Sequence, residues 1–272
     1  MVWVILFFIG LFSGIIGSLV GLGGGIIIVP ALLFVSAYAG FVGDISPQIA
    51  VGTSSLVIIF TSLSSTLMYM KHKTVDYVSG LIFFIGSGPG AIIGALTNKY
   101  LNAESFNMYF GLFIIFISIV LMIKGKLKPT EQSAGGLRVT RSNVDIRGNT
   151  YTYGFNVITA FIITFIVGFL SGIFGIGGGA LMVPAMLLLF RFPPHFAVAT
   201  SMFMIILSST VSSITHISLG NIDWGIALAL IPGAWIGAKI GAMINQRMKG
   251  ETVVVILRIL LIIIGLRLII QI

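Results

Sequence analysis

The stretch GLGGGIIIVPA occupies residues 21–31 of this chain, and GIGGGALMVPA occupies residues 175–185. Both stretches open with a cluster of glycines, Gly21–Gly25 in the first and Gly175–Gly179 in the second. Both also place Pro-Ala at the same distance behind the cluster. A pattern that recurs in this form predicts a chain built from two related halves.

Further matches follow in the same order in the two halves, and their spacing drifts by only a few residues. AVGTS at 50–54 corresponds to AVATS at 197–201. Coincidence does not preserve order and spacing over so many positions. The other matched pairs are Ser62 with Ser209, Ser65 with Ser212, Asp76 with Asp223, Pro89-Gly90 with Pro232-Gly233, and Gly94 with Gly237.

The composition places both halves in a membrane. The chain is 57% hydrophobic and only 8% charged, whereas a soluble globular domain carries about 25% charged residues. Its apolar runs are long enough for helices that span a bilayer, which take about 20 residues each. The run at 259–264 lacks the alternation of a membrane β-strand. Because irregular backbone is not stable in hydrocarbon, the predicted fold is an all-α integral membrane protein.

Ten apolar segments can be drawn, five in each half. An odd number makes the second half enter the membrane from the opposite side, as in the inverted repeats of many secondary transporters. The segments after the glycine clusters are short for a bilayer of about 30 Å. They are expected to be re-entrant, with the two clusters meeting near the centre, unless both arms span fully and the clusters lie at opposite faces. The ten segments are 3–21, 26–41, 48–70, 77–97, 105–123, 154–174, 180–190, 197–218, 224–246 and 251–271.

The basic residues indicate the orientation, because Lys and Arg accumulate in cytoplasmic loops. Placing the 124–153 loop in the cytoplasm puts eleven basic residues on that side and only Lys99 in the loops of the other. Both termini then lie outside the cytoplasm. The 124–153 stretch is polar and rich in Gly, Ser and Thr, so a flexible cytoplasmic linker is expected there. It separates a first transmembrane repeat at 1–123 from a second at 154–272.

These paired motifs resemble those of the sulfite exporter TauE/SafE family. The resemblance rests on the two glycine clusters with their following Pro-Ala and on the AVGTS and AVATS stretches. It extends over nearly the whole chain apart from 124–153. It implies a multi-pass transporter of small anions in the prokaryotic inner membrane, with sulfite and organosulfonates as the usual substrates. The anion, the direction of transport and the coupling ion stay open.

The glycine clusters are the first candidates for substrate binding. A helix that starts behind such a cluster directs free N–H groups and its positive dipole end at whatever lies there, so an anion can be held without a charged side chain. The alternative is close helix packing, which small residues permit in membranes. The candidate residues are Gly23, Gly24, Gly25, Gly177, Gly178 and Gly179.

Hydroxyl and cationic side chains complete the predicted site. Thr53, Ser54, Thr200 and Ser201 can donate to the oxygens of sulfite or a sulfonate. Alternatively, they bond back to the preceding turn of their own helix or make contacts between helices. Lys239 is a cation within an apolar segment and therefore a candidate anion contact. Alternatively, its long side chain reaches towards the lipid headgroups.

The remaining motifs favour transport over catalysis. His72, His195 and His216 are scattered, and no metal-ligand or nucleotide-binding motif is present, so neither an enzyme, a cofactor nor a nucleic acid partner is expected. The seven carboxylates fall in loops or at segment ends. The expected function is therefore a secondary transporter that exports a small sulfur-containing anion by alternating access. A passive anion channel, or uptake of another small anion, is the alternative, and a homo-oligomer is compatible with either.

Overall fold

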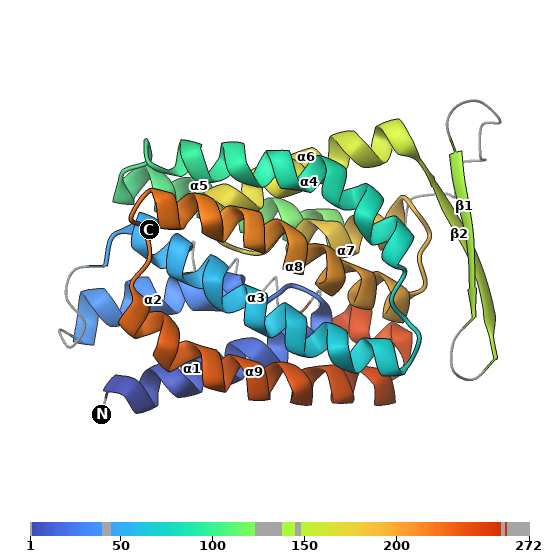
Figure 1. Ribbon diagram of the computed structural model, residues 1–272, viewed down its shortest axis with the longest axis horizontal. Helices are drawn as coiled ribbons and strands as arrows, with labels where there is room; N and C mark the ends of the chain where they lie inside the picture. Colours follow the sequence, from blue (N-terminus) through green and yellow to red (C-terminus); the bar gives the residue numbers. More distant parts are fainter. Residues whose placement is uncertain (1, 40–44, 123–137, 145–147, 257–258, 260–272) are drawn as a thin grey trace.

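The computed structural model describes residues 2–39, 45–122, 138–144, 148–256 and 259 (Figure 1). Within these ranges the chain is mostly helical, and its helices lie side by side in one bundle. A two-stranded hairpin stands at one end of the bundle. The elements are α1 (Val2–Val20), α2 (Gly25–Ala39), α3 (Pro47–Lys71), α4 (Tyr77–Asn98), α5 (Ala103–Met122), β1 (Arg138–Val144), β2 (Thr150–Asn156), α6 (Val157–Phe174), α7 (Gly179–Leu188), α8 (Pro194–Ser218) and α9 (Trp224–Arg247).

The helices confirm a membrane bundle. Six of those in the described ranges, α1, α3, α4, α6, α8 and α9, are long and apolar enough to cross a bilayer. The helices behind the glycine clusters are short, as predicted: α7 has 10 residues, or about 15 Å of helical rise. A helix occupies each of the first nine predicted segments, and the tenth, 251–271, lies mostly outside the described residues.

Two helix pairs flank the centre of the bundle, α1 with α9 and α4 with α6, and α3 and α8 lie between them (Figure 1). Glycines spaced four residues apart line both pairs. A Cβ atom on Gly233, Gly237 or Gly241 of α9 would overlap a backbone carbonyl of α1. A Cβ atom on Gly90 or Gly94 of α4 would likewise overlap a backbone carbonyl of α6. Close backbone approach through small residues is how membrane helices associate when apolar burial offers no driving force.

Helices α4 and α9 begin at opposite ends of the bundle, and an aspartate precedes each of them, Asp76 and Asp223. The Oδ1 atom of Asp76 accepts a hydrogen bond from the Ser79 N–H at 3.2 Å, and Oδ1 of Asp223 accepts one from Ile226 at 2.9 Å. Each carboxylate thereby satisfies one of the N–H groups that the first turn of a helix leaves without a partner. Asp76 and Asp223 are therefore the N-caps of α4 and α9.

The prediction of an all-α chain with a flexible linker at 124–153 is wrong in one respect. Residues 138–144 and 150–156 pair as antiparallel strands, with Arg141 opposite Tyr153, so helix α6 begins only at Val157. The reason is alternation: Tyr151, Tyr153 and Phe155 occupy one face of β2, as period-two side chains do. Composition alone does not reveal this face, because the intervening residues are polar.

The aromatic face of the hairpin packs against the segment that connects α7 to α8. The rings of Tyr153 and Phe192 are 4.0 Å apart, and those of Phe155 and Phe190 are 5.4 Å apart. Phe83 of α4 stacks on Phe190 from the other side, at 5.5 Å. The hairpin is therefore docked on the bundle through a buried aromatic cluster.

Asp76 is the polar anchor of the docked hairpin. Its buried carboxylate accepts a hydrogen bond from the Tyr153 hydroxyl at 2.9 Å and lies 3.4 Å from the Arg141 guanidinium. Burial by itself raises the pKa of Asp76, but hydrogen bonds from Ser79 and Tyr153 and the charge of Arg141 outweigh it and hold that pKa below its usual range. Burial and the neighbouring Asp76 charge raise the pKa of the Tyr153 hydroxyl. The carboxylate is therefore ionised wherever the hairpin is docked.

We expect Gly237→Ala to destabilise the fold by about 1–3 kcal/mol, since its Cβ would overlap the Leu11 carbonyl across the α1–α9 contact. Gly225→Ala on the same helix is the matched control, because its nearest neighbour there is a side-chain oxygen of Asp223 at 3.3 Å. Thermal unfolding in detergent, followed by tryptophan fluorescence, measures both. Equal melting temperatures for the two variants would contradict the close approach of α1 and α9.

We expect Asp76→Asn to release the hairpin, because it removes the charge that pairs with Arg141 and weakens the Tyr153 hydrogen bond. Trypsin should then cleave after Arg138 and Arg141 faster than in the wild type. Asp223→Asn is the control, since asparagine also caps helices and Asp223 lies at the other end of the bundle.

The pH dependence of docking follows from the lowered pKa of Asp76. A lowered carboxyl pKa contributes stability above the unfolded value, about 4, and loses it as the pH falls through the folded value. Docking should therefore be constant from about pH 8 to pH 5 and weaken below about pH 4. Docking of the hairpin that weakens between pH 8 and pH 5 in the wild type would contradict the lowered pKa of Asp76.

Candidate functional site

The two glycine clusters form short loops between consecutive helices. The first loop joins α1, which ends at Val20, to α2, which begins at Gly25, and the second joins α6 to α7. Gly24 and Gly178 adopt left-handed backbone conformations, with φ of +93° and +76°. Such φ values are accessible to glycine at little cost and to other residues only with strain. The loops consequently depend on glycine for their shape.

The two loops meet inside the bundle. A Cβ atom on Gly25 would overlap the carbonyl oxygen of Gly175, and one on Gly179 would overlap the carbonyl oxygen of Gly21. Each loop thus lies against the backbone of the other, and the glycines at these two positions leave the space that the crossing requires. The two glycine clusters are therefore brought together inside the bundle.

Both loops carry backbone N–H groups without a protein acceptor. In the first turn of α2, Ile27 and Ile28 donate to the Gly24 carbonyl. The hydrogen bonds of the described residues provide no acceptor for the N–H groups of Gly24, Gly25 and Ile26, nor for those of Gly178, Gly179 and Ala180. All six residues are buried. A buried N–H without a partner is costly, and a cluster of them at a helix start suits an anion.

Two isoleucines that sequence reasoning missed lie where the loops meet. Cβ atoms on Gly23 and Gly177 would both approach Ile58 of α3, at 3.1 and 3.0 Å, and Ile205 of α8, at 3.4 and 3.2 Å. Both side chains are fully buried. The signal was present in the repeat, because Ile58 and Ile205 follow the AVGTS and AVATS motifs at equal distances. These side chains narrow the space beside both loops with apolar groups.

The predicted serines tie each loop to the opposite half of the chain. The Ser54 hydroxyl donates to the Gly175 carbonyl at 2.9 Å, and the Ser201 hydroxyl donates to the Gly21 carbonyl at 3.0 Å. Both serines are fully buried. Their protons are therefore engaged in this conformation, and only their oxygen lone pairs are left for further hydrogen bonds.

The predicted threonines lie beside the serines but act as acceptors. The Thr53 hydroxyl accepts a hydrogen bond from the Asp223 N–H, and the Thr200 hydroxyl accepts one from the Asp76 N–H, both at 3.0 Å. Each threonine thus holds the residue that caps a helix of the other half. Their own protons remain available to a ligand or to a backbone carbonyl.

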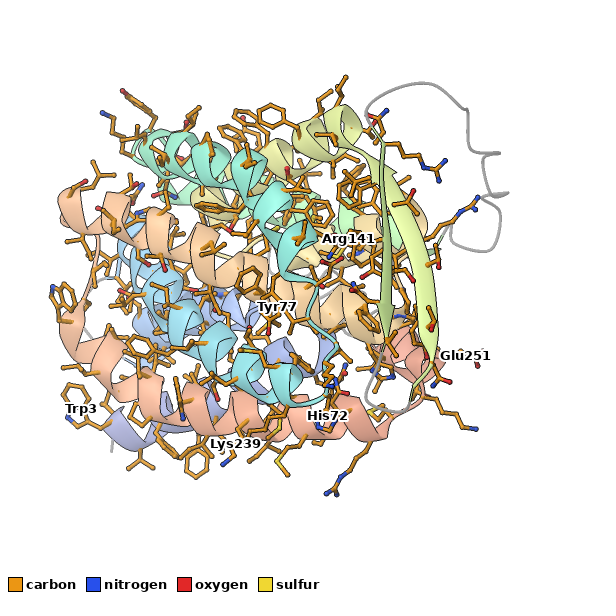
Figure 2. The ribbon with its side chains drawn as sticks, turned by 45° about the vertical axis from the view of Figure 1, so that its right-hand side comes forward. Trp3, His72, Tyr77, Arg141, Lys239 and Glu251 are labelled. Atoms are coloured by element: carbon orange, nitrogen blue, oxygen red, sulfur yellow. The ribbon has the colours of Figure 1, made fainter. Side chains whose placement is uncertain are left out.

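Lys239 is the one predicted residue that the structure does not bring to the loops. Its side chain is exposed on the outer face of α9, whereas the neighbouring Gly237 and Ala238 are buried against the bundle (Figure 2). This placement favours the alternative, in which the side chain extends along the lipid-facing surface towards the headgroups.

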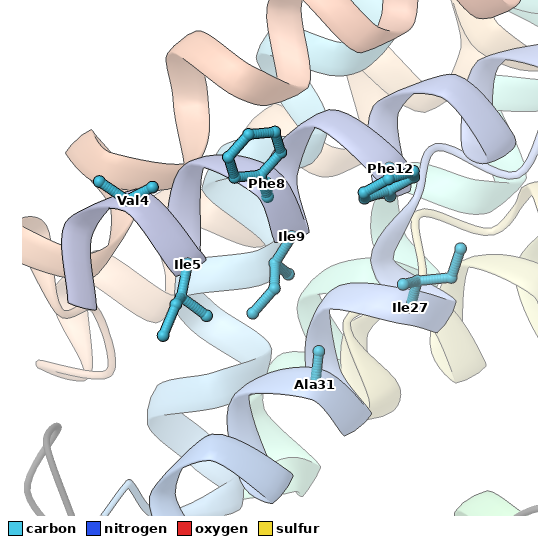
Figure 3. A pocket seen from close by; sticks show the side chains of 7 residues that line it. All are labelled: Val4, Ile5, Phe8, Ile9, Phe12, Ile27 and Ala31. Atoms are coloured by element: carbon cyan, nitrogen blue, oxygen red, sulfur yellow. The ribbon is translucent and has the colours of Figure 1, made fainter. Parts of the chain in front are cut away.

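A cavity between α1 and α2 is unsuited to an anion. It measures about 340 Å³, and every residue that lines it is apolar (Figure 3). Four of the lining side chains, Val4, Ile5, Phe8 and Phe12, are also exposed on the outside of the bundle. Its chemistry matches a lipid acyl chain. The lining residues are Val4, Ile5, Phe8, Ile9, Phe12, Ile27 and Ala31.

We expect Ser54→Ala and Ser201→Ala each to destabilise the protein by about 1–3 kcal/mol, because each leaves a buried glycine carbonyl without its donor. The two variants should lose similar amounts of unfolding free energy, since the two serine–carbonyl hydrogen bonds have similar lengths. Ser218→Ala is the control, as its exposed hydroxyl bonds only to Thr215 of its own helix. Urea or thermal unfolding in detergent measures all three. A loss for Ser218→Ala as large as for the others would refute this account.

Comparison with known proteins places the whole chain in one family. The family model described as sulfite exporter TauE/SafE matches residues 6–268. A Bacillus subtilis (strain 168) protein named probable membrane transporter protein YunE is 56% identical, over 99% of this chain and 98% of its own length. Probable membrane transporter protein MJ0441 of Methanocaldococcus jannaschii is 27% identical, over 96% of this chain and 93% of its own. No solved structure matches. The chain belongs to the sulfite exporter TauE/SafE family of membrane transporters.

Proposed function

We propose that this protein is a secondary transporter that exports a small sulfur-containing anion, sulfite or an organosulfonate, by alternating access around the two glycine loops. The family, and the transporter names of its relatives, support transport. The single observation that carries the site is the meeting of the loops, each with buried N–H groups that have no acceptor among the described residues. Six such donors recognise negative charge without a buried cation.

We further propose that the two halves are inverted repeats with re-entrant segments at α2 and α7. The contacts of one half recur in the other with the partners exchanged, as a two-fold relation requires. Asn98 donates to the Ile173 carbonyl at 2.7 Å, and Asn245 donates to the Leu19 carbonyl at 2.6 Å. The serine, threonine and glycine contacts described above recur in the same way. An axis in the membrane plane follows from the odd number of segments in each half.

Alternating access follows from this geometry. The pairs α1–α9 and α4–α6 are each held by close backbone contacts, so each moves as a unit. Helices α3 and α8 carry Ile58 and Ile205 at the loops. Rocking of one pair against the other moves these side chains apart on one side of the loops and together on the other. The anion then exchanges with one side of the membrane at a time.

The charges at the two ends support an orientation with the hairpin in the cytoplasm. Lys71 and Lys73 flank the end of α3, and Arg247 lies at the end of α9, close to the hairpin. At the other end Trp3 lies near Gly225, which marks the N-terminus of α1 as opposite to the hairpin. By the positive-inside rule the protein then lies in the cytoplasmic membrane of a prokaryote with its N-terminus outside. The C-terminal residues after 259 lie outside the described residues.

Flux of sulfite and methanesulfonate into proteoliposomes tests the proposal. We expect saturable transport by the wild type and at least a tenfold loss in Gly24→Leu and Gly178→Leu, whose side chains would fill the loops. Gly148→Leu is the matched control: its φ of +84° is equally unusual, but nothing lies within 4 Å of the new Cβ atom. Size-exclusion chromatography checks that each variant is folded. Should Gly178→Leu fail that check, Gly178→Ala replaces it, because its Cβ meets only side chains, the nearest at 3.0 Å.

The outcomes separate the parts of the proposal. Flux that rises linearly with the gradient and never saturates would indicate a passive channel. A wild type that moves neither anion would refute the substrate class. Normal flux in folded loop variants would refute the glycine site while leaving transport intact.

A further inference from the structure

A second cavity, larger and polar, opens at the hairpin end of the bundle. It measures about 990 Å³ and lies where the end of α3, the start of α8 and the end of α9 face the hairpin. Its lining includes Thr74, Asn149 and Gln246, so polar side chains contribute from three separate parts of the chain. We call this cavity the vestibule.

The charged side chains of the vestibule are mostly basic. Arg247 and Lys249 contribute two positive charges from the end of α9, against a single carboxylate, Glu251. Two histidines, His72 and His195, also line the vestibule. His72 and Glu251 lie on the side of the bundle that faces the hairpin (Figure 2). The titratable and charged groups that line the vestibule are His72, Tyr151, His195, Arg247, Lys249 and Glu251.

The hydrogen bonds of Asn245 fix how His195 meets the vestibule. The Asn245 amide nitrogen donates to the Leu19 carbonyl at 2.6 Å, so its oxygen is the acceptor in the 3.0 Å contact with Nδ1 of His195. Nδ1 must therefore carry a proton. The orientation of the His195 ring in the wall of the vestibule is thereby fixed.

The same contacts connect the vestibule to the glycine loops. Leu19 precedes Gly21 by two residues, so the chain His195–Asn245–Leu19 runs from the vestibule wall to the start of the first loop. The matching position in the first half is Gln48, whose amide donates to the carbonyls of Asn98 and Leu101. A titratable side chain therefore stands at this position only in the second half.

We propose that the vestibule is a binding site for a small oxyanion, held by Arg247 and Lys249, with His195 in the wall that connects it to the first glycine loop. Its role as the cytoplasmic entry of the transport path rests on the function proposed above. The anion occupies the vestibule first and then passes to the N–H groups of the glycine loops.

Cysteine chemistry tests the site without any transport measurement, because the chain contains no cysteine. Met68→Cys places a thiol in the vestibule, and Met70→Cys places one on the exposed side of the same helix. Each variant is treated with methanethiosulfonate reagents that carry a sulfonate or a trimethylammonium group. The ratio of the two rates reports the local potential, since the effect of pH on the thiol cancels.

At pH 6 we expect the ratio of the sulfonate labelling rate to the trimethylammonium labelling rate to be roughly three- to tenfold higher for Met68→Cys than for Met70→Cys. The preference should fall in the double variant Arg247→Gln/Lys249→Gln, which removes the two cations from the lining. Sulfate and methanesulfonate should slow labelling of Met68→Cys. Equal ratios at both positions, an unaltered ratio in the double variant, or protection by phosphatidylglycerol micelles alone would overturn the site.

Flux through proteoliposomes then tests the role of the vestibule as an entry. His195→Gln and the double variant Arg247→Gln/Lys249→Gln should raise the KM for the anion roughly three- to tenfold from the vestibule side and leave the maximal rate unchanged. Lys239→Gln removes an exposed cation of α9 that lies away from the vestibule. This variant should leave the KM and the maximal rate unchanged. Positive labelling without flux would refute the transporter proposal and retain the anion site. Normal KM values in the vestibule variants would refute the entry role alone.

Discussion

The crossing of the two glycine loops is the contact on which the rest of the structure depends. Gly25 lies against the Gly175 carbonyl and Gly179 against the Gly21 carbonyl, with no room for a side chain at either place. In hydrocarbon, backbone outside a helix is stable only where the protein satisfies its polar groups. Ser54 and Ser201 do so for the two loop carbonyls. The N–H groups of Gly24, Gly25, Gly178 and Gly179 have no acceptor among the described residues, so the chemistry left at the crossing is that of a hydrogen-bond donor.

This arrangement reconciles the two explanations for the glycine clusters. Gly25 and Gly179 serve packing directly, because another backbone occupies the space of their missing side chains. Gly24 and Gly178 instead shape the loops through their φ values and present N–H groups. Packing and anion recognition thus fall to different members of the same cluster, and close packing is what brings the two sets of donors together.

Sequence reasoning predicted the features that depend on local pattern or on the repeat. The helices and the short segments behind the glycines follow from apolar length. The hairpin was missed because strand pairing depends on a tertiary surface, here the rings of Phe190 and Phe192, that composition does not reveal. The exposure of Lys239 was not predictable for a similar reason, since position along a helix does not tell which face is turned outward.

The hydroxyls at 53–54 and 200–201 were predicted to share a site with the glycine clusters, but their hydrogen-bond partners were not predictable. A serine in a membrane helix bonds most often within its own helix, and only the fold brings Ser54 to a carbonyl 121 residues away. The repeat nevertheless contained the information. Matched residues must have matched surroundings if two halves are related, so Ser54 and Ser201 were expected to share one role, and they do.

The direction of transport depends more on how the two halves of the chain differ than on how they resemble each other. Two identical halves would give states open to either side with equal free energies, and a preference for one state then requires an interaction made in only one of them. Among the described residues, such interactions gather at the hairpin end. Asp76 binds Tyr153 and Arg141 of the hairpin, whereas Asp223 caps its helix without such partners. His195 stands where the other half has Gln48. The repeat therefore supplies the transport path that the two halves share. The hairpin contacts of Asp76 and the presence of His195 distinguish one side of the membrane from the other.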